Sequence, residues 1–181
     1  MCVLDSLPDT GPADTGPTDS GPLDTGLPDT GSSAEECNGV DDDDDLQIDE
    51  GDSCPCPVSA FDGRVYLFCR MERDWDAARD LCRSVGYDLA TIVDSEENDF
   101  ILSQTSGAAS DEEEWWIGLN DAASEGTFVW ADGDSSTYRN WDSAEPDGGS
   151  SVACVDTNAN DGTWGDSICS RDQFFVCRAG R

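Results

Sequence analysis

The chain has 181 residues, enough for one domain of ordinary size and an extension. Its formal net charge is −32, all nine basic residues are Arg, and there is no His. A surface this acidic repels nucleic acid and anionic lipid, and the absence of His excludes Ser-His, Cys-His and His-based metal catalysis. The charge therefore favours either the binding of divalent cations or simple solubility in a salty medium, with no nucleic-acid partner.

Nine cysteines are dispersed along the chain without the paired knuckles of a zinc site. Such spacing indicates disulfides, and so predicts an extracellular or cell-surface location. An odd count leaves one cysteine over. The first residues, MCVLDS, suggest that Cys2 is the lipidated first residue of a mature bacterial lipoprotein; an incidental free thiol is the alternative. This lipid is the only membrane contact that we predict.

Residues 7–31 repeat a five-residue unit of the type LPDTG five times. Pro fixes the backbone, Gly frees it, and the Asp side chains repel one another, so such a segment cannot bury a core. We expect residues 1–34 to be a flexible, disordered tether.

The next segment, 35–55, is rich in Asp and is bracketed by Cys37 and Cys54, which could form a disulfide. It resembles a Cys-Asn-Gly-Val-Asp-Asp-Asp motif of bacterial surface proteins that is associated with metal binding. Leu46 and Asp52 depart from a calcium-loop pattern, so a solvated acidic run remains the alternative. Its candidate calcium ligands, at loop positions 1, 3, 5 and 9, are Asp41, Asp43, Asp45 and Asp49.

The pattern becomes that of a folded domain from about residue 56. Alternating β-formers over 63–69 predict a strand. An apolar stripe then predicts a helix that begins after Asp74, a favourable N-cap, and ends before Gly86, a favourable C′ residue. A second strand is predicted over 87–93.

A second helix is predicted after Asp94, because Glu97 stands three residues later in the arrangement of a capping box. Polar loops between 131 and 170 exceed ordinary connections, so they are either functional or held by disulfides. Two early helices followed by short strands predict an α+β fold. The later strands are expected at 115–119, 127–132, 152–156 and 174–178.

A series of short motifs runs through this part of the chain. They are the Trp75–Ala78–Cys82 helix face, the Asp94–Glu97 helix start, WIGL at 116–119, NW at 140–141, EPD at 145–147, WGD at 164–166, and Cys154, Cys169 and Cys177. In this order they resemble the C-type lectin-like domain. The resemblance implies that residues 56–181 form two helices, short antiparallel strands and a long loop region held by disulfides.

The resemblance also implies a disulfide pattern, which spacing alone leaves open. An N-terminal bridge would make this the long form of the domain. The implied pairs are Cys82–Cys177, Cys154–Cys169 and, for the long form, Cys56–Cys69.

In sugar-binding members of the family, EPN or QPD and WND side chains hold a calcium ion, and two sugar hydroxyls complete its coordination. This chain retains Glu145, Asp147 and Asp166 as oxygen ligands, which the resemblance makes both the metal ligands and the carbohydrate contacts. Gly165 and Val152 stand where the family has an Asn and a Glu. The Glu-Pro bond is expected to be cis.

An auxiliary calcium site of the family is matched by Asp121 and Glu125, although Gly148 stands where its third acid often lies. The principal site has lost both amide donors that a mannose-type site uses. Asp147 replaces one Asn with a carboxylate, which only accepts hydrogen bonds, and Gly165 replaces the other with no side chain. We therefore expect weak Ca²⁺ binding, in the range of about 0.1–1 mM, ahead of ordinary sugar affinity. The alternative is a calcium-free loop.

The most favoured function is an extracellular, calcium-dependent carbohydrate-binding module whose partner is a glycan. The alternative is a calcium-independent, protein-binding or adhesive module whose partner is a surface protein. We do not expect an enzyme, because no nucleophile–base pair is evident.

Overall fold

The computed structural model describes residues 35–42, 48–49, 53–106, 114–149 and 151–179. The expected tether over 1–34, the lipid on Cys2, and the loop positions Asp43 and Asp45 lie outside these residues. Neither of the two helices in the described part has the length and apolar character needed to cross a membrane.

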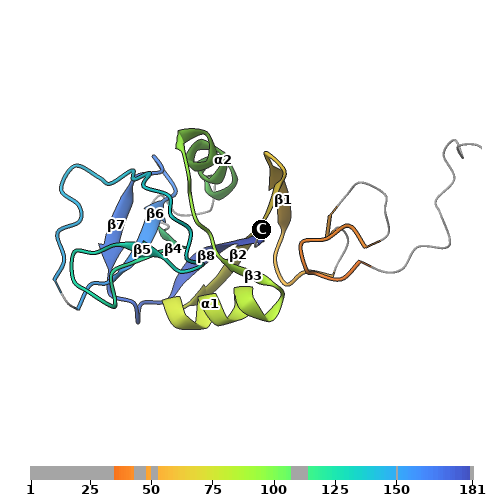
Figure 1. Ribbon diagram of the computed structural model, residues 1–181, viewed down its shortest axis with the longest axis horizontal. Coiled ribbons are helices and arrows are strands. Elements are labelled where there is room, and N and C mark those ends of the chain that lie inside the picture. Colours follow the sequence, from red (N-terminus) through yellow and green to blue (C-terminus); the bar gives the residue numbers. More distant parts are fainter. Residues whose placement is uncertain (1–34, 43–47, 50–52, 107–113, 150, 180–181) are drawn as a thin grey trace, which may run out of the picture. The chain divides into compact units, whose positions relative to one another are not determined.

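The described residues form one sheet of eight strands and two helices (Figure 1). The strand order is β1-β2-β8-β4-β6-β7, with β3 paired to β8 and β5 paired to β4. The α+β class is confirmed, but β4 and β8 run parallel, which the sequence did not predict. The elements are β1 (Val58–Phe61), β2 (Arg64–Arg73), α1 (Trp75–Ser84), β3 (Tyr87–Leu89), α2 (Ser95–Thr105), β4 (Glu114–Asn120), β5 (Val129–Trp130), β6 (Cys154–Asn158), β7 (Trp164–Ser167) and β8 (Gln173–Ala179).

Helix α1 has the predicted ends. The Asp74 side chain accepts a hydrogen bond from the Ala77 N–H at 2.7 Å, as an N-cap does. Gly86 follows the helix with a φ of +83°, a conformation that costs glycine no Cβ clash. The buried face carries Trp75, Ala78 and Cys82, so the predicted stripe does face the core.

Helix α2 begins as predicted, but its expected capping box is only half present. Asp94 accepts from the Glu97 N–H at 2.8 Å. The Glu97 side chain does not return to Asp94; it is fully buried and accepts from the Val93 N–H at 2.7 Å and from the Tyr66 hydroxyl. The expectation of a reciprocal box was wrong, because tertiary partners take this carboxylate.

Several strand predictions also need correction. The strand expected over 87–93 ends at Leu89. At the next residue the Ala90 N–H donates to Val176 of β8, whereas the Ala90 carbonyl accepts from Gly118 of β4, so the chain leaves its pairing with β8. The strand expected over 127–132 is reduced to Val129–Trp130. Strands β1 and β7 were not predicted, since both are short and lack a clear alternation of apolar residues.

Four disulfides hold the described residues together. They pair the same cysteines that the sequence brought forward: Cys37–Cys54, Cys56–Cys69, Cys82–Cys177 and Cys154–Cys169. Cys82–Cys177 joins α1 to β8 across a sequence separation of 95 residues, and a loop of that length corresponds to about 4–5 kcal/mol of lost unfolded-state entropy. Cys154–Cys169 fixes the ends of the β6–β7 hairpin, next to the long loop that precedes it.

The acidic segment is fastened to the edge of the domain through Asp49. This side chain is fully buried and accepts hydrogen bonds from the Asn38 N–H at 2.7 Å, the Gly39 N–H at 2.8 Å and the Tyr87 hydroxyl of β3. A Cβ at Gly39 would lie 2.8 Å from that of Ala179, so only glycine allows this close approach. Asp49 therefore has a structural role whether or not it also binds a metal.

Candidate functional site

The chain between β5 and β6 forms a long loop that is tied to β7. The Asp142 N–H donates to the Trp164 carbonyl at 2.9 Å, and the Trp164 N–H donates to the Asn140 carbonyl at 2.8 Å. Trp164 is fully buried, and its indole N–H donates to Asn98 at 2.8 Å. Figure 1 shows this blue-green part of the chain beside β5, β6 and β7. A rigid aromatic anchor thus holds the base of the loop.

The loop brings Glu145 and Asp147 to Asp166 of β7. One carboxylate oxygen from each of the three lies within 4.8 Å of the others. Glu145 and Asp166 are half-buried, Asp147 is exposed, and the Glu145–Pro146 bond is cis. The structure therefore gathers the three ligands that the sequence selected for the principal site.

Backbone donors of the loop complete this arrangement. The Asp147 N–H donates to Glu145 at 3.1 Å and to Asp166 at 3.3 Å. The Gly148 N–H donates to Asp166 at 3.2 Å. None of the ion pairs within the described residues involves these three acids. Among the described residues, the cluster is thus held by neutral donors and forms no ion pair.

The surroundings of Glu145 in the cluster favour the protonated form of its carboxyl group. Partial burial, together with a side-chain hydrogen bond to Asp166, raises the pKa of Glu145 above its ordinary value. A hydrogen bond between two carboxyl groups requires one shared proton. A divalent cation can replace that proton, and carboxylate oxygens are the ligands that Ca²⁺ prefers.

The two lost ligand positions have different surroundings. A Cβ added at Gly165 would meet Asp156 Oδ1 at 3.6 Å and Glu145 Cδ at 3.7 Å, which are ordinary contacts, so this position has room for a Cβ. Val152 is half-buried and packs towards Gly148. Three carboxylates that each offer one oxygen fill only three of the six to eight sites of a calcium ion, so further oxygens, from water or a ligand, complete its coordination.

The auxiliary position contains an orphaned carboxylate oxygen. Asp121 is buried, and its Oδ2 accepts from the Gly126 N–H at 2.7 Å. Its Oδ1 is buried without a hydrogen-bond partner among the described residues. A hollow of about 90 Å³ lies beside it, lined also by Glu125 and Ala153. Leaving a charged oxygen unsatisfied costs free energy, so this oxygen fits a cation.

The aspartates of the acidic segment are placed only in part. Asp41 lies in the described residues, but the calcium loop over 41–52 includes Asp43 and Asp45, so it stays a prediction. Asp49 lies close to the sulfurs of Cys37 and Cys54. Those sulfurs form a disulfide, which leaves no thiolate to bind a metal.

The carboxylate of Asp156 is buried behind the site, and its burial was not predicted from the sequence. Asp156 of β6 is 3% exposed, and the Gln173 amide donates to it at 3.0 Å and to Glu114 at 3.1 Å. Burial and the Glu114 charge raise the pKa of Asp156 to about 7. Its burial could have been predicted from its position two residues after Cys154, because residues two apart in a strand lie on the same face.

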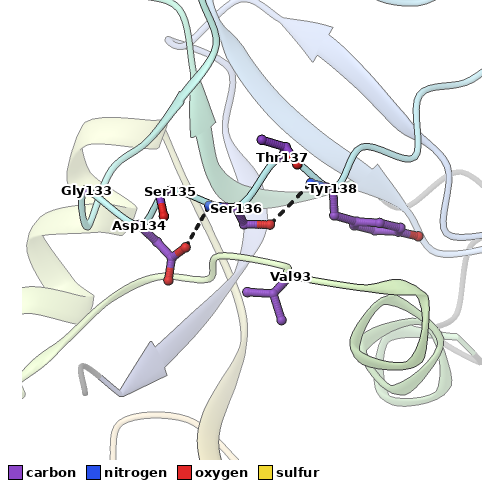
Figure 2. A pocket seen from close by; sticks show the side chains of 7 residues that line it. All are labelled: Val93, Gly133, Asp134, Ser135, Ser136, Thr137 and Tyr138. Carbon is purple, nitrogen blue, oxygen red and sulfur yellow. Dashed lines mark hydrogen bonds between the residues drawn. The ribbon is translucent and has the colours of Figure 1, made fainter.

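A larger hollow, of about 560 Å³, lies near the start of α2 (Figure 2). Its polar groups bond one another: the Ser136 N–H donates to Asp134 at 2.8 Å, and the Tyr138 N–H donates to the Ser136 hydroxyl at 3.3 Å. Asp134 also lies 3.7 Å from Arg178. Since these groups are already satisfied, the carboxylate cluster remains the better candidate for ligand binding.

The model of the Lectin C-type domain family matches residues 71–179. Nattectin of Thalassophryne nattereri, a galactose-specific lectin, is 31% identical over 69% of this chain and 79% of its own length. C-type lectin domain family 4 member M of Symphalangus syndactylus is 32% identical over 69% of this chain, which spans only 29% of that relative. The crystal structure of a calcium-independent type II antifreeze protein superposes with a TM-score of 0.62 and 26% identity, covering 70% of this chain and 94% of its own.

Proposed function

Because the chain belongs to the C-type lectin domain family, we propose that it is a calcium-dependent carbohydrate-binding module whose site is the cluster of Glu145, Asp147 and Asp166. The observation that carries the proposal is the convergence of these three carboxylates within 4.8 Å, with no ion pair to a basic side chain in the described part of the chain. C-type lectin homologues are extracellular or cell-surface proteins, which agrees with the disulfides. The lectin family and fold are typically non-enzymatic.

In this proposal Glu145, Asp147 and Asp166 hold one Ca²⁺, and Asp121 with Glu125 holds a second. The ion supplies a positive centre that attracts the hydroxyl oxygens of a sugar. The chain's own part is to keep the three carboxylates in place through the Asp147 and Gly148 N–H groups, and to hold the loop on β7. With so few protein ligands, affinities in the extracellular range of about 0.1–1 mM are expected.

The test is a calorimetric titration of Ca²⁺ into the full chain, with Asp147→Ala and Asp166→Ala beside the wild type. Both variants should lose the same binding event. Asp121→Asn should lose only a second event, and Asp80→Asn, an exposed acid of α1, should lose neither. Glycan screening in calcium and in EDTA then tests the sugar. A wild type that gives no heat and no stabilisation at millimolar Ca²⁺ would contradict the proposal.

A second candidate is a calcium-independent module that binds a surface protein. Gly165 and Val152 favour it, because they remove two of the ligands that sugar-binding members use. The calcium-independent antifreeze protein shows that the fold does not require the ion. A chelator separates the two candidates, since only the calcium-dependent module should release its ligand in excess EDTA.

We further propose that residues 1–34 tether the domain to a bacterial outer surface through a lipid on Cys2, and that the 35–55 segment binds calcium through Asp41, Asp43, Asp45 and Asp49. Both ideas rest on the repeat and on the motif resemblance in the sequence. Mass spectrometry of the natively exported protein tests the lipid. An unmodified N-terminus would end that part of the proposal.

A further inference from the structure

The proposed site is rich in hydrogen-bond acceptors and poor in donors. Glu145, Asp147 and Asp166 can only accept when ionised. The backbone N–H groups of Asp147 and Gly148, which face the cluster, already donate to Glu145 and Asp166. These two N–H groups are therefore not free to donate to a neutral sugar hydroxyl on the metal, and the carboxylates have no donor to offer it.

The site also keeps a negative charge after a calcium ion is bound, since three carboxylates outnumber its two positive charges. Arg139, which belongs to the same long loop, cannot neutralise it, because its guanidinium donates to the carbonyls of Ser136, Tyr138 and Phe128 and stacks over Trp130.

From this imbalance, and resting on the proposed function, we infer that the ligand is an amino sugar with a free amine. Its hydroxyl oxygens coordinate the calcium ion, and its adjacent ammonium donates to the carboxylate of Asp147, the exposed acid of the cluster. An ammonium group carries three donors and no acceptor, which matches the surplus of acceptors. Hydrogen bonds between ionised groups are also roughly twice as strong as neutral ones.

There is space for such a group. Asp147 is exposed at the rim of the cluster, where a substituent on the sugar ring can reach it. Gly165 leaves open the position at which sugar-binding members of the family have an amide, and only ordinary contacts surround it. Acetylation of the amine would remove both the charge and two of its donors, so the inference separates two sugars of nearly the same shape.

The test compares D-glucosamine, N-acetyl-D-glucosamine and D-glucose as monosaccharides, titrated into the calcium-saturated full chain at about pH 6.5, where the amine is protonated. We expect glucosamine to bind at least about tenfold more tightly than either neutral sugar, because a charged hydrogen bond is gained. The preference should disappear in excess EDTA. Equal or tighter binding of the neutral sugars would overturn the inference.

Two variants distinguish this site from attraction to a chain of net charge −32. Asp147→Asn keeps an oxygen ligand and adds an amide donor, so it should retain calcium, lose the preference for glucosamine and gain affinity for the neutral sugars. Asp80→Asn removes the same charge from α1 and should change nothing. If Asp147→Asn keeps the preference, or Asp80→Asn weakens it as much, the inference is wrong.

The outcomes separate this inference from the function on which it rests. Calcium-dependent binding of neutral sugars would leave the proposed function standing and reject only the amino sugar. Absence of the calcium event, or glucosamine binding that persists in EDTA, would reject the calcium-dependent function and the amino-sugar inference with it.

Discussion

Two regions of the molecule each gather three carboxylates, and they differ in what lies at the centre. Near the start of α2, Glu97, Asp132 and Asp134 surround the Arg178 guanidinium at 3.4, 3.1 and 3.7 Å. Where the long loop meets β7, Glu145, Asp147 and Asp166 converge within 4.8 Å, and no ion pair within the described residues joins them to a basic side chain.

The difference follows from access to solvent. The side chains of Arg178 and Glu97 are 5% and 0% exposed, so a cation from solution cannot reach Glu97, and the chain must supply its own. The loop cluster is half-buried to exposed, and a cation can enter it from water. In a chain with nine Arg and no Lys, the first arrangement is a structural ion-pair network and the second is the cluster that we propose for an external ion.

The largest expected effect comes from removing the internal cation. Arg178→Met should destabilise the fold by about 3–5 kcal/mol, because Glu97 is left charged and buried without its partner. The measurement is the urea midpoint of unfolding near neutral pH. Adding Glu97→Gln to this variant should restore part of the loss, since the orphaned charge is then gone.

Arg64→Met is the matched control. Arg64 pairs with Asp62, whose side chain is 76% exposed, so its loss should cost less than about 1 kcal/mol. If Arg178→Met were as mild as Arg64→Met, the network around Arg178 would not be the closed structural unit described above.

Local and covalent signals were the predictable part of this fold. Asp74, Asp94 and Gly86 act at helix ends within a few residues of their partners, so their roles can be inferred from sequence. The contact between Glu97 and Arg178 spans 81 residues and has no local signature. The same limit hid Asp156, whose neighbours Glu114 and Gln173 come from other strands.

The candidate site shows the same limit. Its three acids could be selected from the EPD and WGD motifs, but the closure of the loop could not. Gly148 was interpreted as a lost acid of the auxiliary site. In the structure, a Cβ at this position would lie 2.5 Å from Val152 Cβ and 2.6 Å from Asp166 Oδ2. Glycine is therefore required for the loop to approach β7 and donate to Asp166, a reason that only the folded chain reveals.

Asp156 offers an intermediate case between the two regions, because it is buried and forms no ion pair within the described residues. Its pKa is raised from 3.8 to about 7, so between these pH values the folded state binds one more proton than the unfolded state. The free energy of unfolding should then fall as the pH rises through this window, by on the order of 4 kcal/mol from this group alone. Asp156→Asn should remove that loss.

The measurement is the urea midpoint of wild type and variant at about pH 4.5 and about pH 8, on either side of the raised pKa. The variant should gain stability relative to wild type as the pH increases. Asp80→Asn, on the exposed face of α1, should show a difference that does not change with pH. A flat difference for Asp156→Asn would mean that this carboxylate already has enough compensation from Gln173 and Ser167.

The smallest effect tests whether the open cluster can be brought closer to a complete site. Gly165→Asn adds an amide oxygen between Glu145 and Asp156, where a Cβ meets only ordinary contacts. It should tighten calcium binding by about fivefold to tenfold, or about 1 kcal/mol, because one more oxygen ligand is added. Calorimetry of the two proteins at the same pH measures it.

Gly165→Ala is the control, since it adds a Cβ and no oxygen. It separates the effect of the added oxygen ligand from the effect of replacing glycine. If Asn tightens calcium binding and Ala does not, the three remaining carboxylates already hold the ion in the geometry that the added oxygen needs. If neither changes the affinity, the cluster is not organised around a cation. Its acids would then be held only by the loop N–H groups. The Arg178 network would remain an ion-pair network with a cation at its centre, and the loop cluster would be an acidic turn without one.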